Sequence, residues 1–152
     1  MTARLSTGLR TNLAGSTGFA ATFANGIIEI RTGTQPATAD AAATGTLLGT
    51  ITKASGAFTP GTATNGLTFA TAADGAVTKS TDQWSFNGVA AGTAGWFRFK
   101  GNAADNDLSS TTLPRLDGSI ATSGGNMGLS NLSIAIGAPT TVDSFVWTQP
   151  AQ

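Results

Sequence analysis

The sequence predicts an all-β protein, an antiparallel β-sandwich of jelly-roll type that follows a short N-terminal helical segment or arm. Three observations indicate this fold. About nine short runs rich in β-branched and aromatic residues follow residue 26, turn-forming residues separate these runs, and no helix-length connection lies between them. At 152 residues the chain is expected to form one domain, with residues 1–26 as the arm or short helices and residues 27–152 as the sandwich.

The first predicted element is a short helix near the N-terminus. Leu5, Leu9 and Leu13 recur every four residues, which is a helical spacing. Ser6 has the side chain of an N-cap, and Gly15 is a candidate for the residue that ends the helix. This row of leucines either covers one end of the sandwich or forms an arm that becomes ordered on a neighbouring molecule.

A second helical turn is expected directly after the first helix. Phe19 and Phe23 lie one turn apart, Ser16 is the candidate N-cap, and Gly26 is the candidate terminator. Both helical segments are short, so the pattern changes to that of strands after residue 26.

The remaining elements are strands of five to eight residues with turn-forming residues between them. The predicted strands are Ile27–Arg31, Thr46–Lys53, Gly66–Ala70, Gly75–Lys79, Gln83–Val89, Gly95–Lys100, Arg115–Thr122, Leu132–Ile136 and Val142–Thr148. Two of them alternate clearly. Phe97 and Phe99 face away from Arg98 and Lys100 in one strand, and the last strand sets two aromatic residues against Ser144 and Val146.

The composition excludes several classes of protein. Charged residues make up 11% of the chain and sum to zero net charge, so nothing indicates binding to nucleic acid or to an anionic membrane surface. No signal peptide is expected. Two long stretches, Ala54–Ala73 and Gly118–Val142, contain no charged residue, but glycine, serine, threonine and asparagine interrupt both, so neither is expected to span a membrane. The low charge indicates either a surface covered by partners or a compositional bias of the genome.

The residues available for catalysis are few, and we expect no enzyme activity. The chain has no histidine, cysteine or tyrosine, which removes the usual general base, the thiol nucleophile and the common zinc ligands. Lys53 with Ser55, and Lys79 with Ser80, are the serine–lysine pairs closest in sequence, and both fit exposed strand ends better than a catalytic pair.

No cofactor or metal is expected either. Asp74-Gly75 and Asp117-Gly118 are typical turn dipeptides. The segment Asn102–Asp107 is the one cluster of hard oxygen ligands. It fits a polar loop better than a calcium site, because the spacing lacks a terminal bidentate glutamate. Trp84, Trp96 and Trp147 are expected in the core or at a subunit interface, with a carbohydrate platform as the alternative.

Four blocks of sequence carry a resemblance to a known family. They are Arg4–Arg10, Thr32–Ala42 running on to Gly45–Thr52, Gly92–Arg98 and Arg115–Ile120. Together they resemble a family of small proteins encoded among the virion genes of tailed bacteriophages and prophages. Within such gene clusters, a chain of this size and strand pattern is similar to capsid decoration proteins, also called cement proteins.

That resemblance implies a partner and a location. The protein would be made in the cytoplasm of the bacterial host and would bind the major capsid protein on the outside of the head. It would also bind itself, as a homodimer or, second in preference, a homotrimer. The expected capsid or subunit contacts are Arg4, Leu5, Leu9, Arg10, Leu13 and Trp147. The alternatives are a structural protein of the tail or baseplate, and a module that binds glycans or receptors.

Overall fold

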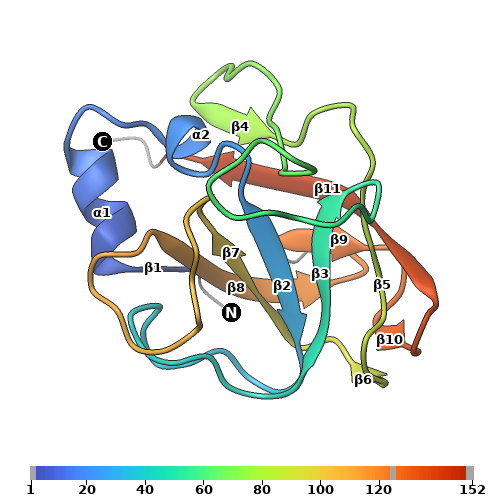
Figure 1. The fold of residues 1–152 in the computed structure, drawn as a ribbon. Coiled ribbons are helices and arrows are strands. Elements are labelled where there is room, and N and C mark those ends of the chain that lie inside the picture. Colours follow the sequence, from blue (N-terminus) through green and yellow to red (C-terminus); the bar gives the residue numbers. More distant parts are fainter. Residues whose placement is uncertain (1–2, 124–125, 150–152) are drawn as a thin grey trace.

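The computed structural model describes residues 3–123 and 126–149, and its regular structure is mainly β-strand (Figure 1). The elements are β1 (Arg4–Leu5), α1 (Thr7–Ala14), α2 (Phe19–Thr22), β2 (Ile27–Arg31), β3 (Leu47–Lys53), β4 (Ala76–Thr78), β5 (Trp84–Asn87), β6 (Gly92–Thr93), β7 (Trp96–Lys100), β8 (Arg115–Ala121), β9 (Met127–Leu129), β10 (Ser133–Ile134) and β11 (Pro139–Thr148). The predicted all-β class, with short helices at the N-terminus, is confirmed.

Seven strands form a closed ring in the order β8, β7, β2, β3, β5, β11, β9. All neighbours in the ring are antiparallel except β8 and β9, which close it as a parallel pair. The arrangement is therefore a mixed barrel, and not a clear pair of stacked antiparallel sheets as in a jelly-roll sandwich. The cause lies in β11: this ten-residue strand pairs with β5, β9 and β4 along its length, with an irregularity between Val142 and Ser144.

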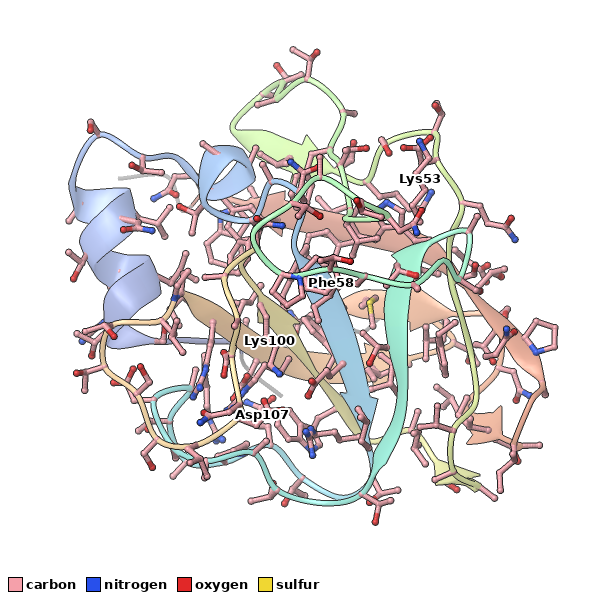
Figure 2. The ribbon with its side chains drawn as sticks, viewed as in Figure 1. Lys53, Phe58, Lys100 and Asp107 are labelled. Carbon is pink, nitrogen blue, oxygen red and sulfur yellow. The ribbon has the colours of Figure 1, made fainter. Side chains whose placement is uncertain are left out.

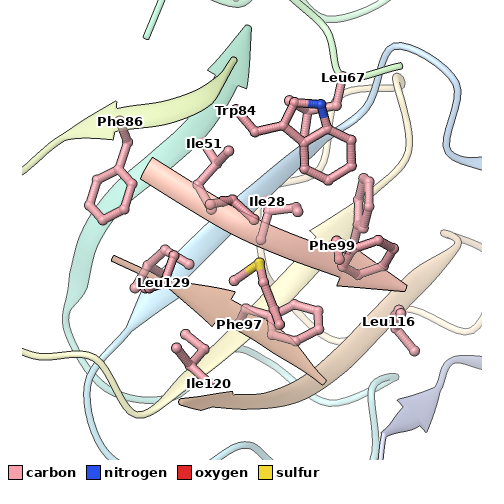
Figure 3. Close-up of a cluster of buried hydrophobic side chains, with 14 of the residues drawn as sticks. Ile28, Ile51, Leu67, Trp84, Phe86, Phe97, Phe99, Leu116, Ile120 and Leu129 are labelled. Atoms are coloured by element: carbon pink, nitrogen blue, oxygen red, sulfur yellow. The ribbon is translucent and has the colours of Figure 1, made fainter. Parts of the chain in front are cut away.

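The barrel interior is filled by the apolar faces of the alternating strands (Figure 3). Phe97 and Phe99 of β7 lie beside Ile30 and Ile28 of β2, and all four side chains are fully buried. Arg98 and Lys100 point to the other side of the sheet. The predicted alternation of β7 is therefore confirmed, and it fixes which side chains are available outside the barrel.

One glycine is needed for the core to close. A Cβ atom on Gly49 of β3 would lie 2.0 Å from the ring of Phe86, so only glycine leaves room for that ring against the sheet. Phe86 lies on β5 and is 1% exposed. Because β5 is the strand between β3 and β11, its side chain completes the packing between those two strands.

The N-terminal helix forms as predicted. The Ser6 hydroxyl accepts a hydrogen bond from the Leu9 amide at 3.1 Å, which is the predicted N-cap, and Gly15 is the C-cap. The same hydroxyl accepts a bond from the Arg115 amide at 2.8 Å and so ties the start of α1 to β8. Since β1 also pairs with β8, the N-terminal segment is a fixed part of the globule in this structure.

Several predicted details of these elements are wrong. Gly18, and not Ser16, precedes α2, because the chain must remain extended to Gly18 before Phe19 can pack into the core. The helix ends at Phe23 and not at Gly26, because Phe23 already leaves the helical conformation. The run Gly66–Ala70 makes only isolated bridges, in which Leu67 pairs with Gly26 and Phe69 with Lys79. Its two bridges go to two different parts of the chain, and it forms no continuous ladder of hydrogen bonds with either of them, so it is not a strand of the barrel.

Candidate functional site

The charged side chains gather on the outer face of β2, β7 and β8. Strand register places Glu29 beside Arg98 and Arg98 beside Asp117, so acids and bases alternate across the sheet. Two loops, residues 32–46 and 101–114, cover this face (Figure 1). The covered ion-pair network consists of Glu29, Arg31, Arg98, Lys100, Asp105, Asp107, Arg115 and Asp117. These are four bases and four acids, half of all the charged residues in the chain.

The pair at the centre of the network is Arg98 with Asp117. Both side chains are 0% exposed, and the guanidinium donates two parallel bonds of 2.8 Å, from Nε to Oδ1 and from Nη2 to Oδ2. Nη2 also donates to the Ala41 carbonyl at 3.1 Å, which attaches the loop 32–46 to the barrel. This two-pronged geometry is the one in which arginine binds a carboxylate most strongly.

Lys100 joins the sheet to the second loop (Figure 2). Its ammonium group lies 2.5 Å from Glu29 Oε1 and 2.8 Å from Asp107 Oδ2. Arg31 completes a four-membered cluster, because its Nη2 lies 2.8 Å from each of the same two acids. With a longer contact of 3.7 Å from Arg98 Nη1, Asp107 is therefore shared by three bases of the barrel, and this sharing holds the loop 101–114 in place.

The remaining pair fixes the same loop at its other side. Arg115 Nε donates to Asp105 Oδ2 at 2.7 Å and Nη2 donates to Oδ1 at 2.5 Å. Nη2 also donates to the Leu108 carbonyl at 2.8 Å. Residues 105 to 108 are thus bound to β8 as well as to β2 and β7.

Burial and ion pairing shift the pKa values of these four acids in opposite directions. Burial raises the pKa of Asp117, and the hydrogen bonds from Arg98 offset that effect only in part. Burial likewise raises the pKa of Glu29, with a partial offset from Lys100. For Asp105, burial is outweighed by the bonds from Arg115 and from the Asp107 amide together with the charges of Lys100 and Arg115, so the pKa of this carboxyl lies below its ordinary value. The pKa of Asp107 is lowered in the same way, chiefly by Lys100.

The arrangement suits a structural clamp better than a catalytic or metal site. Each acid of the Asn102–Asp107 loop is bound by a base of the barrel, and in residues 3–123 and 126–149 no group of three or more potential ligands is placed to hold a metal ion. The prediction of a turn at Asp117-Gly118 is wrong, since both residues lie inside β8. The sequence signal that could have revealed the network is the alternation of charge on Arg98, Lys100, Arg115 and Asp117 within predicted strands.

The serine–lysine pairs have other partners in the structure. Lys53 forms an exposed ion pair with Asp82 at 3.1 Å, and the Ser55 hydroxyl lies 2.8 Å from that of Ser85. The Lys79 ammonium donates to the backbone carbonyls of Ser80 and Asp82. These contacts fit the interpretation of both lysines as strand-end residues.

The residues predicted to contact a partner are not equally accessible. Leu9 is 0% exposed and packs in the core, so it cannot contact a partner in this conformation. Leu5 and Leu13 are half-buried against the same core. The guanidinium of Arg4 donates to the carbonyls of Gln35 and Pro36. Arg10 is the one of these residues that is exposed.

The tryptophans do not present a flat aromatic surface. Trp84 and Trp96 are at most 1% exposed, and Trp96 lies beneath the guanidinium of Arg98, 5.5 Å from its ring centre. Trp147 is half-buried and stacks on Phe19 at 4.8 Å with an angle of 6° between the rings. All three thus contribute to internal packing.

A second feature is a side of the barrel without charge. A cavity of about 410 Å³ lies there, between residues 55–58 and the end of β5, with Ile27, Phe58 and Val89 among its lining residues. Residues 130–139 lie alongside, because Gly88 forms a bridge with Ile136. We call residues 55–58, 86–94 and 130–139 the uncharged face, since none of them carries a charge.

Comparison of the chain with protein-family models, curated proteins and solved structures gave no match. Among the described residues, no helix combines the length and the apolar character needed to cross a membrane.

Proposed function

We propose that this protein is a structural component of a tailed-bacteriophage particle: a decoration protein that binds the major capsid protein on the outside of the head and performs no reaction. The blocks of sequence that resemble phage virion proteins support the phage assignment. The geometry supports the broader part of the proposal, namely that the protein works by binding other protein surfaces.

One observation carries that broader part: half of the charges neutralise one another inside the ion-pair network. The charges outside the network are Arg4, Arg10, Asp40, Lys53, Asp74, Lys79, Asp82 and Asp143. They are spread over an accessible surface of 7095 Å², and two of them pair with each other. A surface with so few charges loses little hydration free energy when another protein covers it.

The clamp also suits this role mechanically. Ion pairs and hydrogen bonds hold the two long loops, residues 32–46 and 101–114, against the barrel. A rigid surface loses little conformational entropy on binding, which favours repeated, identical contacts on a lattice. The proposal does not depend on the jelly-roll sandwich expected for decoration proteins, because a closed barrel with fixed loops offers the same kind of surface.

Two other functions are the alternatives. A tail or baseplate protein would share every feature above and would differ in copy number. A glycan-binding module that uses tryptophan is disfavoured, because Trp84 and Trp96 are buried and Trp147 stacks on Phe19.

The test is the number of copies of this protein in purified particles of a phage that encodes it, measured by quantitative gel staining against the major capsid protein. A ratio near one, or a simple fraction of it, is expected for a protein that covers the lattice. A ratio of a few per cent would contradict the decoration role and favour the tail. Particles that lack the protein are expected to assemble but to open at a lower temperature, because a ligand of the assembled lattice stabilises it.

A further inference from the structure

One buried lysine of the ion-pair network lies between two carboxyl groups (Figure 2). Lys100 is 3% exposed, and its ammonium group lies 2.5 Å from Glu29 Oε1 and 2.8 Å from Asp107 Oδ2. The same group donates to the Asp105 carbonyl at 3.1 Å. All three hydrogens of the ammonium group therefore have oxygen atoms of the protein as acceptors, and Nζ is held against the carboxyl group of Glu29.

The two acids beside Lys100 differ in their tendency to ionise. Burial raises the pKa of Glu29 by more than the charge and the hydrogen bond of Lys100 lower it. Burial also acts on Asp107, but the hydrogen bonds from Lys100 and Glu29 and the charges of Lys100 and Arg31 outweigh it, so the pKa of Asp107 lies below its ordinary value. When neighbouring acids have pKa values that are pushed apart, the neutral one suits the role of acid or electrophile and the ionised one suits the role of base.

An arginine lies on the far side of Glu29 from the lysine. Arg31 Nη2 and Nε donate to Glu29 Oε2 at 2.8 and 3.1 Å, and Oε2 is the oxygen that does not contact Lys100. Negative charge that developed on Oε2 would thus meet two donors that are already in position. Glu29 is 6% exposed, so little water reaches its carboxyl group. A nucleophile, an electrophile, a base and a pair of oxyanion donors therefore share one covered site.

We propose that Lys100 and Glu29 join spontaneously in an isopeptide bond, which links β7 to β2 on the covered face of the barrel. Asp107 takes one proton from the ammonium group, and the amine that results attacks Cδ of Glu29. The Nζ–Cδ bond forms and the Cδ–Oε1 bond breaks. Oε1 leaves as water with the acid proton of Glu29 and a second proton from Nζ, and Asp107 releases its proton to solvent. The step needs no oxidant, reductant or cofactor.

The fold supplies what this condensation lacks in free solution. Two groups that are held in contact react as if their concentration were far above any that is reached in water. The reaction occurs once within the chain and acts on no other molecule, so it is compatible with a protein whose role is to bind other proteins. The inference does not depend on the partner proposed above, and either can fail while the other holds.

The experiment is intact-mass spectrometry, under denaturing conditions, of purified full-length protein that has been kept folded at neutral pH for several days. The wild-type protein is expected to be about 18 Da lighter than its sequence, because one water is lost. After digestion with trypsin, the peptides Thr11–Arg31 and Phe99–Arg115 are expected as one linked species. The linked species stays uncut after Lys100, because trypsin does not cleave beside an acylated lysine.

Three variants test the roles of the residues. Lys100→Arg keeps the positive charge but has no nucleophilic amine, so it is expected to retain its full mass. Asp107→Asn is expected to form the bond at least about a hundredfold more slowly, because the proton acceptor is gone. Lys53→Arg is the matched control, since Lys53 also contacts an acid, Asp82 at 3.1 Å, but in an exposed pair. This control is expected to lose the same mass as the wild-type protein.

Several results would overturn the inference. They are a wild-type protein that keeps its full mass, a loss that persists in Lys100→Arg, and formation of the bond in Asp107→Asn at the wild-type rate. So is a peptide that places the loss at Asp74-Gly75, because an aspartyl–glycyl turn that closes to a cyclic imide loses the same mass. The fluorescence of the buried Trp84 checks that each variant is folded. If a variant does not fold, the presence or absence of the linked peptides in the wild-type protein decides the question.

Discussion

Replacing Asp117 by asparagine removes one negative charge from the centre of the ion-pair network and leaves the size of the side chain unchanged. Arg98 stays charged and keeps one bond to the asparagine oxygen, the Ala41 carbonyl, and Asp107, whose Oδ1 lies 3.7 Å from Nη1, but the other oxygen of its carboxylate partner is replaced by an amide group that can only donate. Both members of the pair are 0% exposed, so water cannot replace the lost carboxylate. Leaving such a charge unpaired costs about 3–5 kcal/mol, and the remaining contacts of Arg98 place the expected loss near 3 kcal/mol.

The assay is urea-induced unfolding at neutral pH, followed by the fluorescence of the buried tryptophans, together with thermal unfolding. A loss of about 3 kcal/mol corresponds to a melting temperature lower by roughly 6–12 °C for a domain of this size. Asp82→Asn is the control, because it breaks the exposed pair with Lys53 and is expected to change the stability by little more than the error of the measurement. If Asp117→Asn costs no more than Asp82→Asn, the network is not a clamp.

A double-mutant cycle separates the pair from its surroundings. Arg98→Met and Asp117→Asn are each expected to destabilise the protein, and the double variant is expected to be more stable than the sum of the two losses implies, by about 1–3 kcal/mol. Additive losses would contradict a direct interaction between the two side chains.

Three further predictions concern single positions. Gly49→Ala is expected to destabilise the fold by about 1–3 kcal/mol, because the new Cβ meets the ring of Phe86; Gly18→Ala, where no atom lies within 4 Å, should show no such loss in the same urea titration. Ser6→Ala is expected to cost about 2 kcal/mol in thermal unfolding, since the hydroxyl that caps α1 also accepts a bond from β8, and restoration by Ser6→Thr would identify the hydroxyl as the cause. Asp105 has a lowered pKa in the folded protein, so its contribution to stability is complete above the unfolded value of about 3.9 and is lost as the pH falls through the folded value. Asp105→Asn should therefore be less stable than the wild type from pH 7 to pH 5, with a gap that narrows below about pH 4; a gap independent of pH would refute this.

The strands were predictable where apolar and charged side chains alternate along the sequence. The two faces of β7 followed from its sequence alone, because phenylalanine and basic residues take turns along it. The N-cap at Ser6 was also predictable, since its hydroxyl acts within the first turn of the helix. Local signals of this kind need no knowledge of the rest of the chain.

The closure of the barrel could not be predicted in this way. β9 has three residues, and its parallel pairing with β8 depends on where β11 places it. The interpretation of Asp117-Gly118 as a turn failed for a related reason: the dipeptide preference is a local one, and the partner that keeps Asp117 inside a strand, Arg98, lies 19 residues away. The burial of the basic residues of β7 was also beyond the sequence, because the loops that cover them have no pattern of their own.

The pairing of β1 with β8 has a consequence for the synthesis of the protein. The Ser6 hydroxyl bonds to the amide of Arg115, 109 residues later. At about 5–20 residues per second, a ribosome needs roughly 5–22 s to make the chain between them. During that interval Leu9 has no β8 to pack near. The first helix has eight residues, which is too short for it to be stable alone in water, so it remains largely unfolded. The segment Arg4–Ala14 therefore cannot take its place against β8 until the ribosome has made Arg115, and until then its leucines stay available to chaperones and to other nascent chains.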